Sequence, residues 1–363
     1  MSEGMRLAVI GVGRIGVFHA RYVQELSRER GDCELVAVVD GFGDLAEGTA
    51  QRLQGGQERE IRAFGSVEEL LAAGAVDGAV IASRTEDHYG DAKGLIDAGL
   101  RVLLEKPLTG SLETARAFAA YLNGEESRRY SLMQAFMRRF DAPLVHARQA
   151  LKRGMIGRPF KIVSVLEDPQ PPPNGYNSPG LLADMAVHNV DEVMWLVGAS
   201  PQVVSGAGSR IYNQKIASVE EDFDDVFLQM WCADEMVAQV QVSRNHVAGY
   251  RNETWVYGEE GLIHVGAFQG DPRTVVFEAY GRGGAIERRD FALPGYDEIV
   301  PVFIERFGPA YKAEIAHYIE QCQQGEPFAV DQEDGVRALE VVAAGSRALK
   351  TRDGGVPVDY VGG

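Results

Sequence analysis

The sequence predicts an α/β protein with an N-terminal doubly wound parallel sheet followed by a second, sheet-based domain. From Met5 to about Arg138, short β-branched runs alternate with longer amphipathic stretches, which is typical of repeated βαβ units. After Pro143, closely spaced apolar strands and Gly-rich turns indicate antiparallel pairing. We therefore expect domains at residues 1–138 and 139–363.

The first domain's strands are continuous apolar runs rather than alternating ones, so both faces of their sheet should be covered, as in parallel sheets. A helix is expected from Val17 to about Glu29. Ser66-Val-Glu-Glu69 forms a capping box and predicts a second helix through Leu71. The expected strands lie at residues 6–10, 34–39, 78–82 and 101–104.

The second domain should begin with a helix from Val145 to Arg153 and a strand after Gly157-Arg-Pro-Phe160. The stretch from Asp168 to Pro173 contains four prolines and is predicted to be a loop. Further strands are expected at 226–231, 236–242, 253–257 and 262–265, and two helices with a 3.6-residue period at 311–323 and 335–350.

Composition excludes several classes of protein. The 363 residues are 45% hydrophobic and 25% charged, as in folded proteins, and the net charge of −17 disfavours nucleic acid and anionic membranes as partners. Cys33, Cys232 and Cys322 lack disulfide-framework or metal spacing. No apolar run is long enough to span a bilayer, and no signal-type segment starts the chain. We expect a cytoplasmic protein without a structural metal.

A glycine motif indicates dinucleotide binding. Gly11-Val-Gly13-Arg-Ile-Gly16 follows the first strand directly and opens the first helix. Gly11 would allow the tight turn, Gly13 the close approach of a pyrophosphate, and Gly16 the packing of helix on strand. Arg14 and Ile15 are assigned to the same site. The alternative is a purely structural glycine-rich turn.

Asp40 ends the second strand, 24 residues after Gly16. A carboxylate there can accept hydrogen bonds from both ribose hydroxyls of an adenosine, and it would repel a 2′-phosphate. Gly41-Phe-Gly43 offers no Arg or Lys that could bind such a phosphate. The sequence therefore predicts NAD rather than NADP.

Glu105-Lys106-Pro107 follows the strand that ends at Leu104. Ligands of open parallel sheets bind beyond the carboxyl ends of the strands, so the Lys106 ammonium could polarise a substrate oxygen. Taken alone, Lys106 is better interpreted as a solvated turn residue. Glu105 and Lys106 are assigned to the cofactor site together with Ser83, Arg84 and His88, although a structural role is favoured for His88.

Asp184 and His188 would lie on one helical face if residues 184–196 form a helix, with Asp191 one turn further. His188 can take a proton from an alcohol, and the carboxylate can orient the substrate or the imidazole. A helical histidine is more often structural. We exclude a metal because no third ligand or HExxH spacing occurs nearby. We expect Lys106, Asp184 and His188 to meet between the two domains.

Together, Gly11–Gly16, Asp40, Glu105–Pro107 and Asp184–His188 resemble the Gfo/Idh/MocA oxidoreductases. Several short motifs in order resemble the inositol 2-dehydrogenase branch of that family: 136–141, 249–250 ahead of 256–262, and 305–307 followed by 310–311 and Glu314. The resemblance implies a Rossmann domain and a C-terminal α/β domain with a large, open, mostly antiparallel sheet. It also implies NAD-dependent oxidation of a ring secondary alcohol, with Lys106, Asp184 and His188 as the catalytic triad. Arg138, Asp168 and Tyr250 are assigned to the substrate.

One segment departs from that branch. Inositol dehydrogenases typically carry His-Arg-Asn-Pro where this chain has Leu166-Glu-Asp-Pro169. The substrate could therefore be another inositol isomer, a pyranose or a modified sugar. An NAD-using dehydratase or isomerase of a sugar derivative and a non-catalytic NAD-sensing regulator remain as alternatives. We expect a homodimer or homotetramer that buries the uncovered face of the second sheet.

Overall fold

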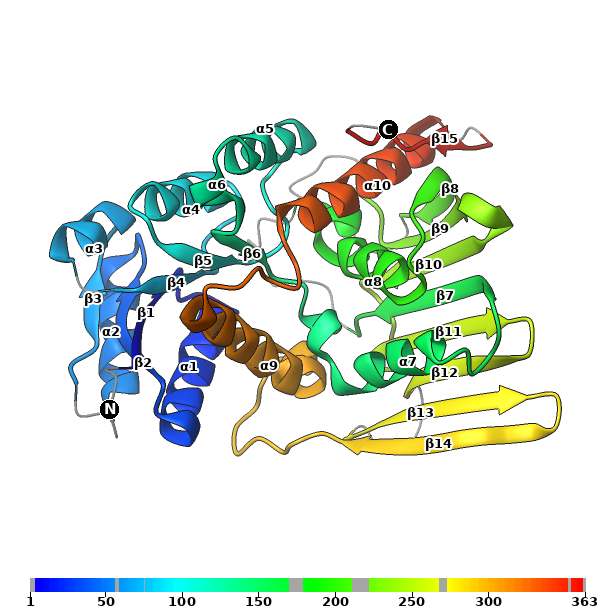
Figure 1. Cartoon of the computed structure of the whole chain (residues 1–363), viewed down its shortest axis with the longest axis horizontal. Coiled ribbons are helices and arrows are strands. Elements are labelled where there is room, and N and C mark those ends of the chain that lie inside the picture. The colour runs from blue at the N-terminus through cyan, green and yellow to red at the C-terminus, as the bar shows by residue number, and fades with distance from the viewer. Residues whose placement is uncertain are drawn as a thin grey trace. The chain divides into compact units, whose positions relative to one another are not determined.

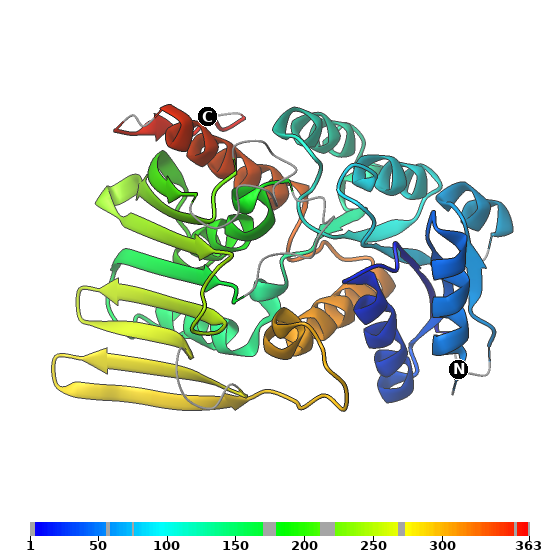
Figure 2. The same ribbon diagram turned by 180° about the vertical axis from the view of Figure 1, so that it is seen from behind.

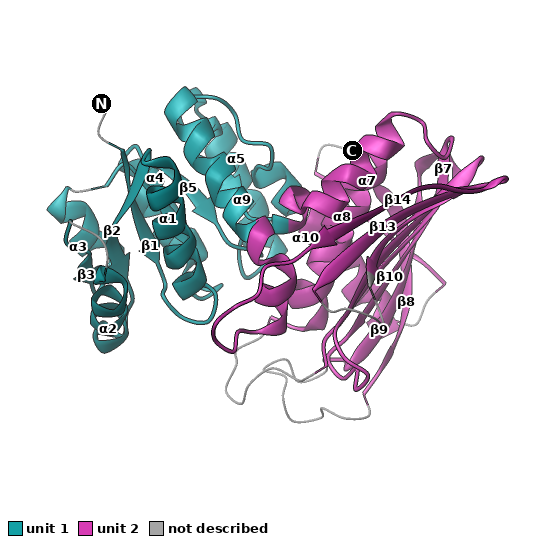
Figure 3. Ribbon diagram, turned by 90° about the horizontal axis from the view of Figure 1, so that it is seen from below, with its two compact units in different colours: residues 1–137, 311–336 teal, residues 138–310, 337–363 magenta. Residues whose placement is uncertain are grey.

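The computed structural model describes residues 4–55, 59–74, 76–169, 179–210, 222–267, 273–351 and 354–361. These divide into two compact units (Figure 3). Unit 1 comprises residues 1–137 and 311–336, and unit 2 comprises residues 138–310 and 337–363. The sequence analysis assigned all of 139–363 to the second domain, whereas the segment 311–336 packs with the first.

Unit 1 contains a six-stranded sheet in the order β3-β2-β1-β4-β5-β6, and every neighbouring pair is parallel. This is the doubly wound order of dinucleotide-binding folds, so the predicted fold of the first domain is confirmed. The short strands β3 and β6 were not predicted. The strands are β1 (Met5–Ile10), β2 (Cys33–Val39), β3 (Arg62–Phe64), β4 (Gly78–Ile81), β5 (Arg101–Leu104) and β6 (Leu132–Gln134).

Helices cover both faces of this sheet, with α1 and α2 on one side and α4 and α5 on the other (Figures 1 and 2). Ser66 caps α3 by accepting a hydrogen bond from the Glu69 amide, and Glu69 accepts one from the Gly65 amide in return. The predicted Ser66 cap is therefore present, and Glu69 reaches back to the amide one residue before the N-cap. The helices are α1 (Gly16–Arg30), α2 (Gly43–Gln54), α3 (Val67–Ala73), α4 (His88–Asp97), α5 (Leu112–Asn123) and α6 (Glu126–Arg129).

The chain returns to unit 1 within α9 (Val302–Gln324). The buried Tyr318 hydroxyl accepts a hydrogen bond from the Ala79 amide at 3.1 Å and donates one to the Arg101 carbonyl at 2.6 Å. A Cβ atom at Gly78 would lie 2.4 Å from that hydroxyl. Tyr318 therefore joins the starts of β4 and β5, and this contact requires glycine at position 78.

Unit 2 contains a nine-stranded sheet in the order β14-β13-β12-β11-β7-β10-β9-β8-β15. The β7–β10 pair is parallel and the other pairs are antiparallel, so the predicted large, mostly antiparallel sheet is confirmed. The strands are β7 (Pro159–Glu167), β8 (Pro201–Ser209), β9 (Asp225–Cys232), β10 (Val237–Ser243), β11 (Arg251–Gly258), β12 (Gly261–Ala267), β13 (Thr274–Gly281), β14 (Gly284–Ala292) and β15 (Val356–Pro357).

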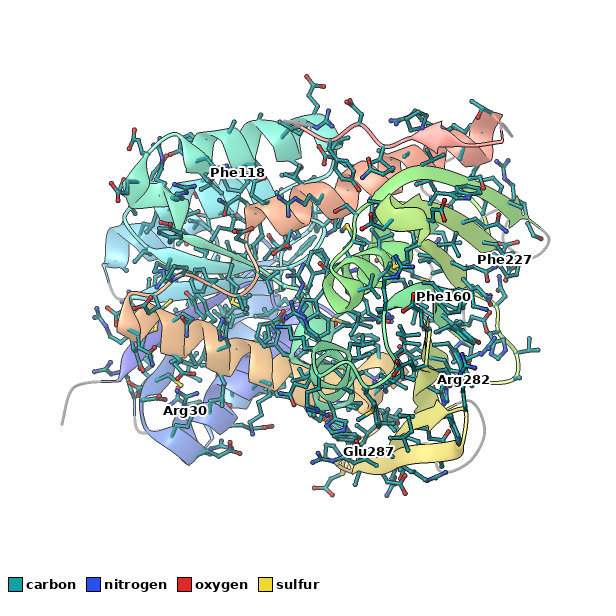
Figure 4. All side chains as sticks on the ribbon, turned by 45° about the vertical axis from the view of Figure 1, so that its right-hand side comes forward. Arg30, Phe118, Phe160, Phe227, Arg282 and Glu287 are labelled. Atoms are coloured by element: carbon teal, nitrogen blue, oxygen red, sulfur yellow. The ribbon has the colours of Figure 1, made fainter. Side chains whose placement is uncertain are left out.

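Helices α7 (Ala142–Lys152), α8 (Val187–Val197) and α10 (Gln332–Thr351) lie on one face of this sheet (Figure 3). Short helical segments occur at Met137–Phe140 and Ala233–Glu235. On the opposite face, Phe227 of β9 is 49% exposed and Trp231 is 41% exposed; Figure 4 labels Phe227. Of the predicted loop 168–173, Asp168 and Pro169 lie outside any strand, and 170–173 fall outside the described residues.

Candidate functional site

The glycine turn after β1 requires glycine at two positions and leaves a third open. Gly11 has φ +79°, and a Cβ atom there would lie 2.5 Å from the Ser83 backbone. A Cβ atom at Gly16 would lie 1.8 Å from the Gly11 carbonyl oxygen. A Cβ atom at Gly13 would meet nothing within 4 Å. The turn therefore leaves space at Gly13, beside the positive N-terminal end of α1, which suits a pyrophosphate.

Asp40 lies at the carboxyl end of β2 beside this turn. Its two oxygens accept hydrogen bonds from the Val12 and Phe42 amides, both at 3.0 Å. Two amide donors fix the plane of the half-buried carboxylate and leave further lone pairs for a ligand. Among the other residues assigned to this turn, Arg14 is exposed and Ile15 is half-buried at the start of α1.

The loops after β4 and β5 are joined by His88. Its Nδ1 atom lies 2.8 Å from the Pro107 carbonyl oxygen, and its Nε2 atom lies 3.2 Å from that of Ser83. Burial lowers the pKa of His88 and outweighs the two carbonyl contacts, which raise that pKa. His88 thus links the two loops from below the surface, whereas Arg84 is exposed and pairs with Asp87 at 3.1 Å.

Glu105 is buried immediately before Lys106. One carboxylate oxygen lies 2.8 Å from His19 Nε2, and the other accepts a hydrogen bond from the Lys106 amide at 3.1 Å. Burial alone would raise the pKa of Glu105, but the His19 hydrogen bond, the electrostatic effect of His19 and the charge of Lys106 outweigh burial and lower that pKa. An ionised carboxylate therefore fixes the main chain at half-buried Lys106.

In unit 2, Asp184 and His188 lie where a π-helical turn leads into α8. The turn spans Leu182–Ala186, and α8 begins at Val187, so the first turn of the predicted helix has π geometry. Such turns are rare and occur often at functional sites. His188 is buried and Asp184 is half-buried.

Two residues that the sequence analysis missed support this turn. Arg244 lies 3.5 Å from Asp184 and donates a hydrogen bond to Asp222 at 2.8 Å. Asp222 also accepts the Leu181 amide at 2.9 Å. These partners are far from Asp184 in sequence, so no local pattern could reveal them.

Asp191 has a structural role. Its carboxylate forms an ion pair with Arg139, with Nε at 3.0 Å and Nη2 at 2.5 Å. Both side chains are largely buried. Asp191 was expected to follow Asp184 and His188 along the same helix. It ties α8 to the segment before α7.

The residues assigned to the substrate share one electrostatic neighbourhood. Tyr250 is within electrostatic range of Asp168 and Arg138, and burial raises the pKa of its hydroxyl. Arg138 is buried and donates to Glu192 at 2.6 Å. All three predicted substrate residues belong to unit 2, and Asp168 and Arg138 both act electrostatically on Tyr250.

Comparison with known proteins agrees with this arrangement. A family model for the oxidoreductase family with an NAD-binding Rossmann fold matches residues 5–132, and one for the GFO/IDH/MocA C-terminal domain matches residues 144–264. The chain belongs to the Gfo/Idh/MocA family of oxidoreductases. The predicted family and the predicted cofactor, NAD, are therefore confirmed.

Similar proteins match over nearly the full length. The inositol 2-dehydrogenase of Rhizobium meliloti (strain 1021) is 28% identical over 347 residues, 95% of this chain and 97% of its own. The scyllo-inositol 2-dehydrogenase (NAD(+)) of Bacillus subtilis (strain 168) is 28% identical over 360 residues, which is 99% of this chain and 97% of its own. The crystal structure of a myo-inositol dehydrogenase from Corynebacterium glutamicum ATCC 13032 has a TM-score of 0.81 at 26% identity and covers 99% of this chain and 100% of its own.

Two further findings concern the described part of the chain. Within it, no group of three or more His, Cys, Asp or Glu side chains is arranged to hold a metal ion. None of the helices described there is both long and apolar enough to cross a membrane.

The glycine turn yields a paired prediction. Gly13→Ala should leave the free energy of unfolding within about 1 kcal/mol of the wild type, because its methyl group meets nothing in the protein, but should weaken NAD binding about tenfold or more. Gly16→Ala should lower the unfolding free energy by about 1–3 kcal/mol, because the methyl group overlaps the Gly11 carbonyl. Chemical denaturation and NAD titration measure both effects. Unchanged NAD affinity in Gly13→Ala would place the pyrophosphate elsewhere.

Proposed function

We propose that this chain oxidises a secondary hydroxyl of a cyclic polyol or sugar to a ketone, with NAD as the hydride acceptor. The observation that carries the proposal is the turn into α8, where Asp184 and His188 lie together in a domain of the Gfo/Idh/MocA family. Full-length similarity to inositol dehydrogenases supports a ring polyol as the substrate class.

Three residues are proposed to carry the chemistry. His188 acts as general base and takes the proton of the substrate hydroxyl. Lys106 donates a hydrogen bond to the same oxygen and stabilises the developing negative charge. Asp184 orients the substrate or the imidazole, and Arg244 and Asp222 hold the turn that carries it. When NAD is bound, its nicotinamide would supply the acceptor for the hydride of the carbinol carbon.

Binding of the ring is proposed to involve Arg138, Asp168 and Tyr250. Glu192 holds Arg138 in place, and the raised pKa of Tyr250 keeps its hydroxyl protonated and able to donate. Polar side chains with a fixed orientation discriminate strongly between hydroxyl stereoisomers, because an unmatched isomer leaves buried groups unpaired. We also propose a cytoplasmic location, which the three free cysteines support.

The catalytic proposal predicts a loss of turnover without a loss of cofactor binding. In His188→Ala, kcat should fall on the order of 10²–10⁴-fold, because general-base catalysis contributes about that factor. The NAD dissociation constant should stay nearly unchanged. A panel of polyols and sugars, monitored through formation of reduced nicotinamide, first identifies the substrate.

The same kcat measurements on Lys106→Ala and Asp184→Asn, with the substrate that the panel identifies, complete the series. Near-wild-type turnover of His188→Ala would remove His188 from the mechanism and leave Lys106 as the acid/base group. Absence of nicotinamide reduction with every member of the panel would contradict the proposed function itself.

Cofactor selectivity is predicted to depend on Asp40. The double change Asp40→Ser with Gly41→Arg should shift preference towards NADP, because it removes a negative charge and adds a guanidinium that can bind a 2′-phosphate. A Cβ atom at Gly41 meets nothing within 4 Å, so a side chain can begin there without a clash. The measurement is kcat/KM for both cofactors. An unchanged preference would mean that Asp40 does not face the ribose, and equal efficiency of the wild type with both cofactors would contradict the choice of NAD.

We further propose a homodimer or homotetramer assembled through the face of the nine-stranded sheet that carries Phe227 and Trp231. Exposed aromatic side chains on a sheet face are typical of surfaces that a partner covers. Light scattering at micromolar concentration should report a multiple of 39.6 kDa. A mass equal to the monomer would overturn this assembly, and Trp231→Glu should shift an oligomer towards the monomer.

A further inference from the structure

A buried histidine lies behind the Lys106 loop. His19 is in the first turns of α1 and is fully buried. Its Nε2 atom lies 2.8 Å from the Glu105 carboxylate, and its ring meets the Tyr311 ring edge-on at 5.6 Å between centroids. Neither His19 nor Tyr311 has a part in the chemistry described above.

The contact partners determine which nitrogen of His19 carries a proton. An ionised carboxylate can only accept hydrogen bonds, so Nε2 must be the donor to Glu105. Within the described residues, no hydrogen-bond partner lies near Nδ1. The contact of Nε2 with Glu105 is therefore the hydrogen bond that fixes the His19 ring.

The second oxygen of Glu105 completes a chain of contacts from α1 to Lys106. That oxygen accepts the Lys106 amide at 3.1 Å. The chain therefore runs from the His19 ring through the Glu105 carboxylate to the main chain of Lys106. All of its members lie in unit 1 and are buried or half-buried.

We propose that His19 and Glu105 are positioning residues that fix the main chain of Lys106 and couple it to α1. The proposal rests on the function proposed above for Lys106. Because α1 begins at the glycine turn, one rigid helix then sets both the cofactor-binding turn and the position of the lysine. His88 holds the following residue through the Pro107 carbonyl, so the loop is fixed on both sides of Lys106.

Charge strengthens this arrangement. The titratable groups within electrostatic reach of Glu105 are His19, Lys106 and His88. The His19 hydrogen bond, the electrostatic effect of His19 and the charge of Lys106 lower the pKa of Glu105 against the effect of burial. Loss of the His19 donor would let burial dominate, and Glu105 would then take up a proton at a higher pH.

The kinetic test compares two substitutions of His19 with a control on the same helix. His19→Leu removes the donor, whereas His19→Gln can retain it, because the glutamine amide nitrogen occupies nearly the place of Nε2. Gln24→Leu is the matched control: Gln24 is also buried on α1, but it donates to the Leu53 carbonyl at 2.6 Å, away from Glu105.

We expect kcat of His19→Leu to fall on the order of ten- to a hundredfold, as displaced catalytic groups do, with NAD affinity changed less than about threefold. The acidic limb of its kcat–pH profile should move to higher pH. His19→Gln should recover most of the turnover, and Gln24→Leu should keep the wild-type kcat and pH profile even if it lowers the melting temperature.

A second readout does not depend on activity. The chain has seven lysines, so ¹³C-dimethyl-lysine NMR resolves them individually, and Lys106→Arg identifies the Lys106 signal. His19→Leu should shift the Lys106 signal and leave the others in place, whereas Gln24→Leu should not move it. An unmoved Lys106 signal together with an unchanged pH profile would overturn the proposal. If the wild type reduces no NAD with any polyol, the proposed function fails, and the NMR result alone then decides whether His19 positions Lys106.

Discussion

A carboxylate buried inside a protein needs hydrogen-bond or ion-pair partners. In both units this constraint acts right next to a residue proposed for catalysis. Glu105 of unit 1 and Glu192 of unit 2 are both buried. Each lies close in sequence to a proposed catalytic residue. Glu105 directly precedes Lys106, and Glu192 follows His188 by four residues along α8. Removing one partner of a buried charge costs about 3–5 kcal/mol, so the elements that pair with these carboxylates are strongly constrained.

In unit 2 the pairing fixes α8 on the sheet. Glu192 accepts hydrogen bonds from Arg138 at 2.6 Å and from Ser164 of β7 at 3.0 Å, and a third from Thr254 of β11. Arg139 holds the same helix through Asp191. Because α8 is attached at these points, the orientation of its first turn, and hence of His188, follows from the sheet. The proposed general base is therefore positioned by buried, paired charges of the unit.

The parts of the structure that the sequence could reveal are those encoded by neighbouring residues. The turn Gly11–Gly16, the position of Asp40 after β2 and the Ser66 cap all depend on local spacing. The packing of 311–336 with unit 1 could not be predicted, because helical periodicity shows that a helix has a buried face but not which sheet covers it. Arg244 and Asp222 were missed for a related reason, since their only link to Asp184 is through space.

The faces of β7 on which its side chains lie bear on the departure from the inositol dehydrogenase pattern at residues 166–168. Ser164 faces α8, and side chains alternate along a strand, so Leu166 also faces the helices, where it is 6% exposed. Glu167 points to the other face and contacts Arg251 at 3.4 Å and His246 at 3.5 Å. Asp168 lies within electrostatic range of Tyr250. If Asp168 contacts the ring as proposed, the departure at Leu166–Asp168 places a carboxylate there, and a carboxylate only accepts hydrogen bonds from substrate hydroxyls.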